Sequence, residues 1–139
     1  MREISQVTKD LSVYRLQRAE EDLRSAQSNF EAGELRTAIN RAYYSIFHSL
    51  RAVLALDEYD SKKHSGIISE FRLRYVKTGI FQDDISDMIG KAFKIRNKSD
   101  YDDMYIVSRD DTKEQIENAK QVIGRVQEYM KSEDILPQL

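Results

Sequence analysis

Apolar residues recur every three or four positions along most of the chain, a spacing that places them on one face of an α-helix. In the first such segment, at about residues 8–32, that face holds Leu16, Ala19, Leu23, Ala26 and Phe30. The same repeat predicts four further helices, at about residues 34–56, 64–77, 84–97 and 111–132. No run of alternating β-branched residues indicates a strand. The pattern therefore predicts an all-α fold.

Glycine and aspartate mark several of the expected helix ends. Gly33 follows the first helix and the next begins at once at Glu34, so the turn is short and the two helices should be antiparallel neighbours. Gly79 marks the end of the third helix. Asp83 or Asp84 can cap the fourth helix, because a carboxylate there accepts from free backbone N–H groups.

The last helix and its flanking segments are less regular. Residues 99–109 break the apolar repeat, and we interpret them as a loop that can hold one turn of helix. Asp111 followed by Glu114 resembles a capping box that opens the last helix. Within that helix, Gly124 should permit the close approach of a neighbour. We expect residues 133–139 to be frayed.

Length, composition and charge exclude several classes of protein. A chain of 139 residues is long enough for one domain with a single core. With no Cys, it has no disulfide, thiolate zinc site, Cys nucleophile or iron–sulfur cluster. It has neither a bilayer-spanning apolar run nor an apolar signal core, so we expect a cytoplasmic protein with no membrane contact. Its net charge of −2 means that any RNA contact must come from a local basic patch.

Common catalytic and metal-binding patterns are missing. The five glycines are isolated, so no glycine-rich phosphate loop exists, and no Glu-x-x-His pair supports a di-iron bundle. His48 and His64 fall on different predicted helices without an obvious carboxylate partner. We therefore expect no metal site and no cofactor.

Arg96 is the first unusual position. On a helical wheel of the fourth helix it falls near the middle of the apolar stripe. In one interpretation it lies in the last helical turn, where a cation suits the helix dipole and its side chain reaches water. In the other it is held in a half-buried functional site.

A polar strip on the second helix is the second unusual feature. Asn40, Tyr44, His48 and Arg51 share one face at positions i, i+4, i+8 and i+11, and Arg41 lies beside them. This face could meet Arg96 across the protein, or it could simply be a solvated surface. The acidic, tyrosine-rich residues 99–105 could form an ion pair with Arg96 or remain a solvated loop.

Three segments together resemble the prokaryotic HEPN family. They are residues 40–52 (NRAYYSIFHSLRA), 63–68 (KHSGII) and 91–103 (KAFKIRNKSDYDD). The resemblance covers about residues 10–132, which we take as the core of a single domain over residues 1–139. It implies an antiparallel up-and-down bundle of four to five helices. It also implies a homodimer, with the functional cleft at or near the dimer interface.

Many members of the HEPN family are metal-independent ribonucleases of toxin–antitoxin or defence systems. The resemblance of this chain to the family therefore implies the candidate catalytic residues. Their motif is an arginine, a polar residue, a spacer of three to five residues and a histidine. Arg96 and Asn97 fill the first two places, but Tyr101 or, with longer spacers, Asp102 or Asp103 stands where the histidine should be. With a pKa of about 10, tyrosine is a poor general base at neutral pH. His48 could substitute in space.

The resemblance also implies a partner and leaves two functions open. Prokaryotic HEPN proteins often act with a minimal nucleotidyltransferase, which in some pairs adenylylates a tyrosine near the arginine motif. Tyr101 and Tyr105 are the candidates here. The first function is a toxin–antitoxin component with ribonuclease activity centred on Arg96. The alternative is a non-catalytic module that binds protein or nucleotide. In a third interpretation, Arg96 and the acidic loop form only a structural ion pair.

Overall fold

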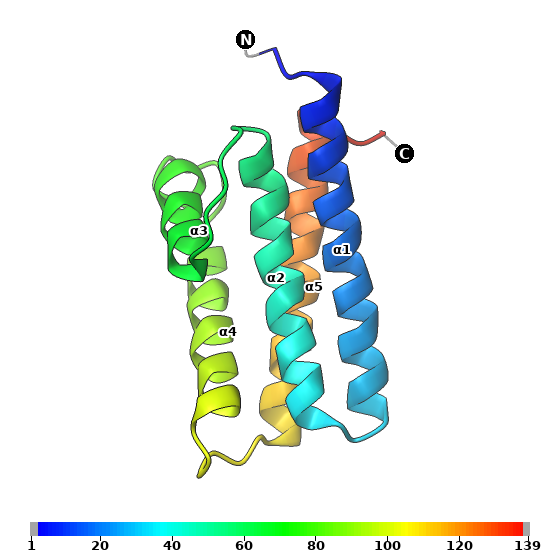
Figure 1. The fold of residues 1–139 in the computed structure, drawn as a ribbon, viewed down its shortest axis with the longest axis vertical. Helices are drawn as coiled ribbons and strands as arrows, with labels where there is room; N and C mark the ends of the chain where they lie inside the picture. The colour runs from blue at the N-terminus through cyan, green and yellow to red at the C-terminus, as the bar shows by residue number, and fades with distance from the viewer. Residues whose placement is uncertain (1–2, 138–139) are drawn as a thin grey trace.

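The computed structural model describes residues 3–137, and every regular element in that range is a helix (Figure 1). Its elements are α1 (Gln6–Glu31), α2 (Leu35–Ala55), α3 (His64–Phe71), a π-helical turn (Arg72–Val76), α4 (Asp84–Tyr101) and α5 (Arg109–Ser132). Residues 3–137 hold no strand, which confirms the all-α prediction. Among the same residues, no helix combines the length and the apolar composition that a bilayer span needs.

The long helices form an up-and-down bundle around α2 (Figure 1). Successive long helices α1, α2, α4 and α5 run in alternating directions, and the short α3 lies beyond the start of α4. α2 packs against α1, α3, α4 and α5. The predicted apolar face of α2 is buried almost completely, with Leu50 and Val53 fully enclosed. An antiparallel helical bundle is therefore the observed architecture.

Local side chains explain why α1 begins and ends where it does. At its start, the backbone N–H of Thr8 donates to the Ser5 hydroxyl at 3.2 Å, so one free helix donor is satisfied. At its end, Gly33 adopts a φ of +79°, a left-handed conformation that glycine tolerates without strain. The expected tight turn into α2 is confirmed.

The structure corrects three predictions about helix ends. α4 continues to Tyr101, well beyond the expected end near residue 97, and Ser99 is buried. Asp83 precedes α4, but its side chain makes no capping hydrogen bond. Ser108, rather than Asp111, caps α5: its hydroxyl accepts from the Asp111 N–H at 3.0 Å. The proposed capping box was wrong because α5 is already capped by Ser108, so Asp111 lies inside its first turn instead of before it.

The expectation of a frayed tail was wrong for residues 133–136. The backbone N–H groups of Ile135 and Leu136 donate to the Met130 carbonyl at 2.8 and 3.2 Å, so the chain turns back on α5. Both side chains are partly buried against the core. Residues 138 and 139 lie outside the described residues.

Gly124 does not mark a close helix contact, since an added Cβ would meet no heavy atom within 4 Å. We therefore expect Gly124→Ala to raise the free energy of unfolding by about 0.5–1 kcal/mol, because alanine costs less backbone entropy inside a helix. Gly66→Ala is the matched control. Its Cβ would lie 2.7 Å from the Ser61 hydroxyl, so it should destabilise the protein. Urea unfolding of the two variants measures both effects, and a destabilised Gly124→Ala would contradict the prediction.

Candidate functional site

Arg96 lies between the aromatic side chains of α2 instead of reaching water. Only 13% of its side chain is exposed. The guanidinium carbon is 5.2 Å from the centre of the Tyr43 ring and 5.5 Å from that of Tyr44, distances at which a cation is attracted by the ring faces. Its Nη2 also donates to the Tyr44 hydroxyl at 3.3 Å. The site is therefore a cation enclosed by two tyrosines.

Two neighbours on α4 also contact the Arg96 guanidinium. Its Nε lies 2.9 Å from Oδ2 of Asp100, one turn further along, and its Nη1 donates to Oδ1 of Asn97 at 3.4 Å. α4 runs on through Tyr101, so Arg96 is not in its last turn. The helix-dipole interpretation was therefore wrong, and the guanidinium is paired locally with Asp100.

Residues 101–105 approach Arg96 through Tyr101 alone. The Tyr101 ring centre is 5.9 Å from the guanidinium carbon, yet 76% of the residue is exposed. Asp102 instead accepts from the Met104 N–H at 3.0 Å and tightens the following turn. The Tyr105 carbonyl accepts from Arg36, and burial followed by the charge of Asp111 raises the pKa of the Tyr105 hydroxyl.

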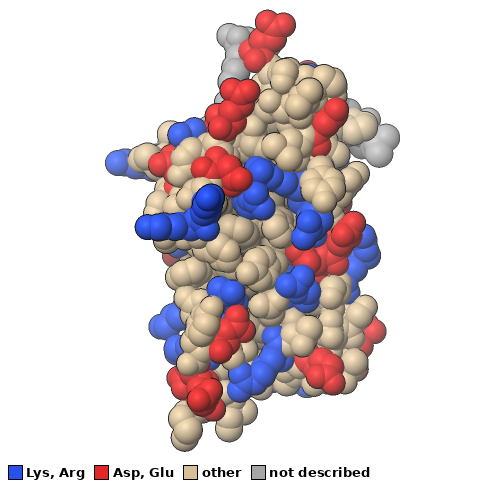
Figure 2. All heavy atoms as spheres, in the orientation of Figure 1, with Lys and Arg blue, Asp and Glu red and all other residues tan. Residues whose placement is uncertain are grey.

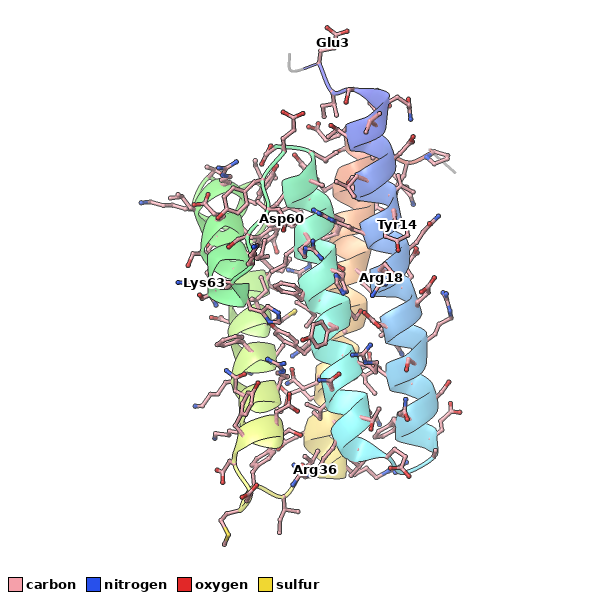
Figure 3. The ribbon with its side chains drawn as sticks, viewed as in Figure 1. Glu3, Tyr14, Arg18, Arg36, Asp60 and Lys63 are labelled. Atoms are coloured by element: carbon pink, nitrogen blue, oxygen red, sulfur yellow. The ribbon has the colours of Figure 1, made fainter. Side chains whose placement is uncertain are left out.

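Arg36 ties this segment to α2. One guanidinium nitrogen donates to the Ser99 carbonyl and the other to the Tyr105 carbonyl, the latter at 2.9 Å. Figure 3 shows Arg36 near the end of α2 from which the helix starts, next to the segment that joins α4 to α5. Arg36 thereby satisfies one carbonyl in the last turn of α4 and one in the loop that follows, which stabilises the end of this helix.

His64, at the start of α3, belongs to the same cluster. Its Nδ1 lies 2.8 Å from the Tyr43 hydroxyl, and its ring centre is 4.2 Å from that of Phe47. The edge of the Tyr44 ring packs against it, with 5.7 Å between centres. Burial, followed by the charges of Arg96 and Arg51, lowers the pKa of His64. Sequence reasoning left His64 without a partner, because the chain between α2 and α3 carries no periodic signal.

An ion-pair clamp places His64 beside Tyr43. The chain leaves α2 and doubles back along it, so that Asp60 meets Arg51 at 3.1 Å and Arg15 of α1 at 3.3 Å. Figure 3 shows Asp60 beside the upper part of α2. Burial alone would raise the pKa of Asp60, but the hydrogen bonds from Arg51 and the Ser61 N–H lower it below its usual value. Asp60 therefore stays ionised and holds the segment that leads to α3.

The polar strip of α2 divides between two neighbours. Only Tyr44 reaches Arg96. Arg41 instead pairs with Asp22 of α1 at 3.0 Å and donates to the Asn40 side chain at 2.7 and 3.2 Å. His48 also faces α1, with its Nε2 3.8 Å from Asp22. Asp22 thus faces His48 from another helix, which the sequence did not reveal, but the two side chains are not hydrogen-bonded.

His48 and Asp22 are both held toward their neutral forms. Burial, and then the charges of Arg51, Arg18 and Arg41, lower the pKa of His48 to about 4. Burial raises the pKa of Asp22 despite its pairing with Arg41. Within residues 3–137, the buried Nδ1 of His48 and Oδ2 of Asp22 have no hydrogen-bond partner.

Basic side chains, with acidic ones between them, border an uncharged area on this face of the protein. Figure 2 shows Lys and Arg on several sides of a region where α2 meets α3 and α4. Figure 3 shows Arg18 on the side of α1 nearest α2, and Lys63 beside α3. The described residues include no group of three or more His, Cys, Asp or Glu arranged to hold a metal ion. The chemistry that this face offers is that of arginine, histidine and tyrosine.

Comparisons with known proteins point to one family. The HEPN domain model matches residues 12–129. A Methanocaldococcus jannaschii protein named "Putative toxin MJ0605" is 41% identical over 83 residues, which are 60% of this chain and 62%, less than two thirds, of that protein. "Putative toxin MJ0142" of the same organism is 25% identical over 121 residues, 87% of this chain and 82% of its own. A UPF0332 protein of Archaeoglobus fulgidus is 34% identical over 96 residues, 69% and 76% of the two chains.

The lowered pKa of His48 predicts a loss of stability in acid. His48 is neutral in the folded protein down to about pH 4, whereas an unfolded histidine binds a proton near pH 6.5. The unfolded state therefore binds more protons as the pH falls through this window. We expect His48 to account for a loss of roughly 3 kcal/mol between pH 7 and pH 4, partly offset by proton uptake at Asp22.

Urea unfolding of the wild type and His48→Gln across this pH range measures that contribution. The difference in unfolding free energy between the two proteins should shrink as the pH falls. Any pH dependence that persists in the variant belongs to other groups. A difference that stays constant from pH 7 to pH 4 would contradict the lowered pKa.

Proposed function

Because the chain belongs to the HEPN domain family, we propose that it is a toxin-like HEPN protein that cleaves RNA without a metal ion. Two relatives carry the name "Putative toxin", which supports the toxin-like assignment. Arg96 and Asn97 form the centre of the proposed site, and Tyr101 stands at its edge. Asn40, Arg41, Tyr44, His48, Arg51, Asp102 and Tyr105 are the further residues that we propose for binding.

One observation supports this function above the others: Arg96 is a cation held where α4 meets α2, with only 13% of its side chain exposed. Cleavage of RNA by its own 2′-hydroxyl places negative charge on a five-coordinate phosphorus, and a planar guanidinium with several donors stabilises such charge. An arginine already oriented by Tyr43, Tyr44 and Asn97 loses little freedom when phosphate binds. Its field is also stronger there than on a fully solvated surface.

We propose that RNA approaches along α2, where Arg41 and Arg51 supply the local basic patch that a protein of net negative charge needs for RNA contact. Arg41 and Arg51 keep 34% and 24% of their side chains exposed. Each is paired with a single carboxylate, and that carboxylate leaves some guanidinium donors free for phosphate oxygens. Asp100 lies at the other end of the site and repels phosphate. We therefore propose that the RNA backbone follows α2 rather than the segment after α4.

A non-catalytic module remains the second candidate function, and a specific contact favours it. Arg96 already has Asp100 as a counter-ion at 2.9 Å, so a phosphate must compete with that carboxylate. Tyr101 stands where the family motif has a histidine, and a phenol with a pKa of about 10 is a poor base. In this alternative, the aromatic face around Arg96 binds a nucleotide or a protein and leaves RNA intact.

The main test is RNA cleavage by the wild type and by Arg96→Ala in the presence of a chelator. We expect the substitution to lower the cleavage rate by about 10²–10³-fold, the usual effect of removing a group that stabilises the transition state. Arg125→Ala is the matched control, because Arg125 pairs with Asp84 at the opposite end of α4. It should cleave RNA at the wild-type rate.

Three outcomes separate the interpretations. Wild-type protein that binds a nucleotide or RNA but never cleaves it would establish the non-catalytic module. Cleavage unaffected by Arg96→Ala would place the activity elsewhere. If Arg96→Ala unfolds while Arg125→Ala does not, Arg96 serves mainly to stabilise the fold through its contacts with Asp100, Tyr43 and Tyr44. Thermal melting of the two variants distinguishes that case.

We further propose a homodimer that acts with a minimal nucleotidyltransferase, and Tyr101 is the better placed acceptor. Its side chain is exposed and lies next to Arg96, whereas Tyr105 is partly buried. Met104 and Ile106 are 88% and 87% exposed, so an apolar surface for a partner flanks this tyrosine. In the reaction, the Tyr101 oxygen would attack the α-phosphorus of ATP and release pyrophosphate, placing a phosphate beside Arg96.

Mass spectrometry after co-expression with a neighbouring nucleotidyltransferase tests this partnership. We expect the mass of one AMP added per chain, its loss in Tyr101→Phe and its retention in Tyr105→Phe. Native spectra of the same samples should show twice the chain mass of 16.3 kDa. An unmodified protein held in a stable complex with the transferase would contradict the modification. A monomer would contradict the dimer.

A further inference from the structure

We propose that His64, supplied by α3, is the general base of the RNA-cleaving site and that Tyr43 orients it. This inference rests on the proposed ribonuclease function. It fills the place that the family motif leaves empty in this chain, where Tyr101 follows Arg96 and Asn97. The histidine comes from a different helix and therefore has no fixed spacing from the arginine.

The contacts of Tyr43 join the two proposed groups. Its ring face meets the guanidinium of Arg96 at 5.2 Å, and its hydroxyl meets Nδ1 of His64 at 2.8 Å. Tyr44 bridges them a second time: its hydroxyl accepts from Arg96, and its ring edge packs against His64. The cation and the imidazole are therefore held by the same two side chains, which fixes their relative position as catalysis requires.

The free nitrogen of His64 is available to a substrate. Nδ1 is hydrogen-bonded to Tyr43, whereas Nε2 has no hydrogen-bond partner among residues 3–137. Nε2 is also not among the unpartnered side-chain atoms that are fully buried in that range. The His64 ring is only half-buried. It stacks on the Tyr43 ring and contacts the tilted Phe47 ring, and these contacts hold its plane. A ribose 2′-hydroxyl can reach Nε2.

The proposed role requires the tautomer of His64 in which Nδ1–H donates to the Tyr43 hydroxyl oxygen, 2.8 Å away. Burial raises the pKa of Tyr43, so its phenol stays neutral. When Nδ1–H of His64 donates to the Tyr43 oxygen, the lone pair lies on Nε2 and can accept a proton. The same bond then stabilises the imidazolium that forms. Tyr43 thus acts as a positioning residue in the way that a carboxylate does in a hydrolytic triad.

The charged groups around His64 keep it unprotonated near neutral pH. Arg96 faces it from α4 and Arg51 from α2, and both lower the pKa of His64 in addition to burial. The groups packed against the ring from α2 are Tyr43, Tyr44 and Phe47, which are uncharged at neutral pH. His64 is therefore a neutral base beside a permanent cation.

The proton and bond changes of the step balance as follows. Nε2 of His64 takes the 2′-hydroxyl proton while that oxygen bonds to the adjacent phosphorus, and Arg96 stabilises the charge on the phosphoryl oxygens. The bond from phosphorus to the 5′-oxygen breaks, and the 5′-oxygen takes a proton from solvent. The products are a 2′,3′-cyclic phosphate and a 5′-hydroxyl end. His64 then returns its proton to solvent.

His48, the other histidine, is less suited to this step. It packs against Asp22 of α1, its Nδ1 is buried, and only 12% of its side chain is exposed. Its pKa of about 4 also makes it a weaker base than a histidine near neutrality. Tyr44 separates its ring from Arg96, with 5.9 Å between the centres of the Tyr44 and His48 rings. His64 is therefore the candidate that geometry favours.

The test compares single-turnover cleavage of an RNA oligonucleotide by the wild type, His64→Gln and Tyr43→Phe. We expect His64→Gln to lose about 10²–10⁴ in rate, the usual range for general base catalysis. Tyr43→Phe should lose less, because the base remains but is no longer oriented. Tyr75→Phe is the matched control, since its buried hydroxyl bonds to Asp57 away from this site. It should keep the wild-type rate.

The pH profile and rescue distinguish a base from a structural histidine. The wild-type rate should rise with pH through an apparent pKa below 6.5 and then level off, and this rise should vanish in His64→Gln. Added imidazole should partly restore cleavage by His64→Ala. NMR titration should show that Arg96→Ala raises the pKa of His64. The 2′-O-methyl form of the oligonucleotide should stay intact.

The failure of this inference differs from the failure of the proposed function. If Arg96→Ala abolishes cleavage while His64→Gln keeps the wild-type rate and pH profile, His64 is not the base although the ribonuclease stands. If the wild type cleaves no RNA, the proposed function fails and this inference fails with it. An NMR pKa of His64 that Arg96→Ala leaves unchanged would also overturn the pairing of the two groups.

Discussion

The central position of α2 in the bundle is the constraint on which the rest of the structure depends. Four helices pack around it, so polar groups on its surface must find partners on a neighbouring helix. Arg41 and His48 find Asp22 on α1, Tyr44 finds Arg96 on α4, and Tyr43 finds His64 on α3. Each pairing crosses between helices that are distant in sequence. The candidate site is thus a product of how α2 is enclosed.

Arg96 combines a structural and a proposed functional role that place conflicting demands on its contacts: the carboxylate that stabilises it in the fold also weakens its attraction for phosphate. Its contacts with Tyr43, Tyr44 and Asp100 compensate for removing a charge from water, and they also hold the guanidinium in one orientation. Asp100 reduces the positive field that a phosphate would meet. An anion that binds here must displace the Asp100 carboxylate, which costs free energy. This cost is reduced because the Asp100 side of the ion pair is partly exposed to water.

The two histidines show how position in the bundle sets chemical character. Both flank the Tyr44 ring, at nearly equal distances between centres. His48 lies inside the α1–α2 contact, where burial and four arginines keep it neutral far into acid. His64 is the first residue of α3, and its Nε2 has no hydrogen-bond partner among residues 3–137. The Asp60 clamp makes this difference, because it folds the chain after α2 back along the helix.

The sequence by itself determined the helices, because a 3.6-residue repeat and glycine at the turn after α1 are local signals. It also singled out Arg96 and Tyr44, since a polar residue in an apolar stripe is visible without a partner. Helix ends were less predictable. The start of α5 depends on which of several nearby side chains accepts from its first N–H groups, and Ser108 does so. The end of α4 depends on Arg36, which is over 60 residues away in the sequence. Only the tertiary structure brought His64 to Tyr43 and Asp22 to His48, because through-space pairing leaves no regular spacing in the chain.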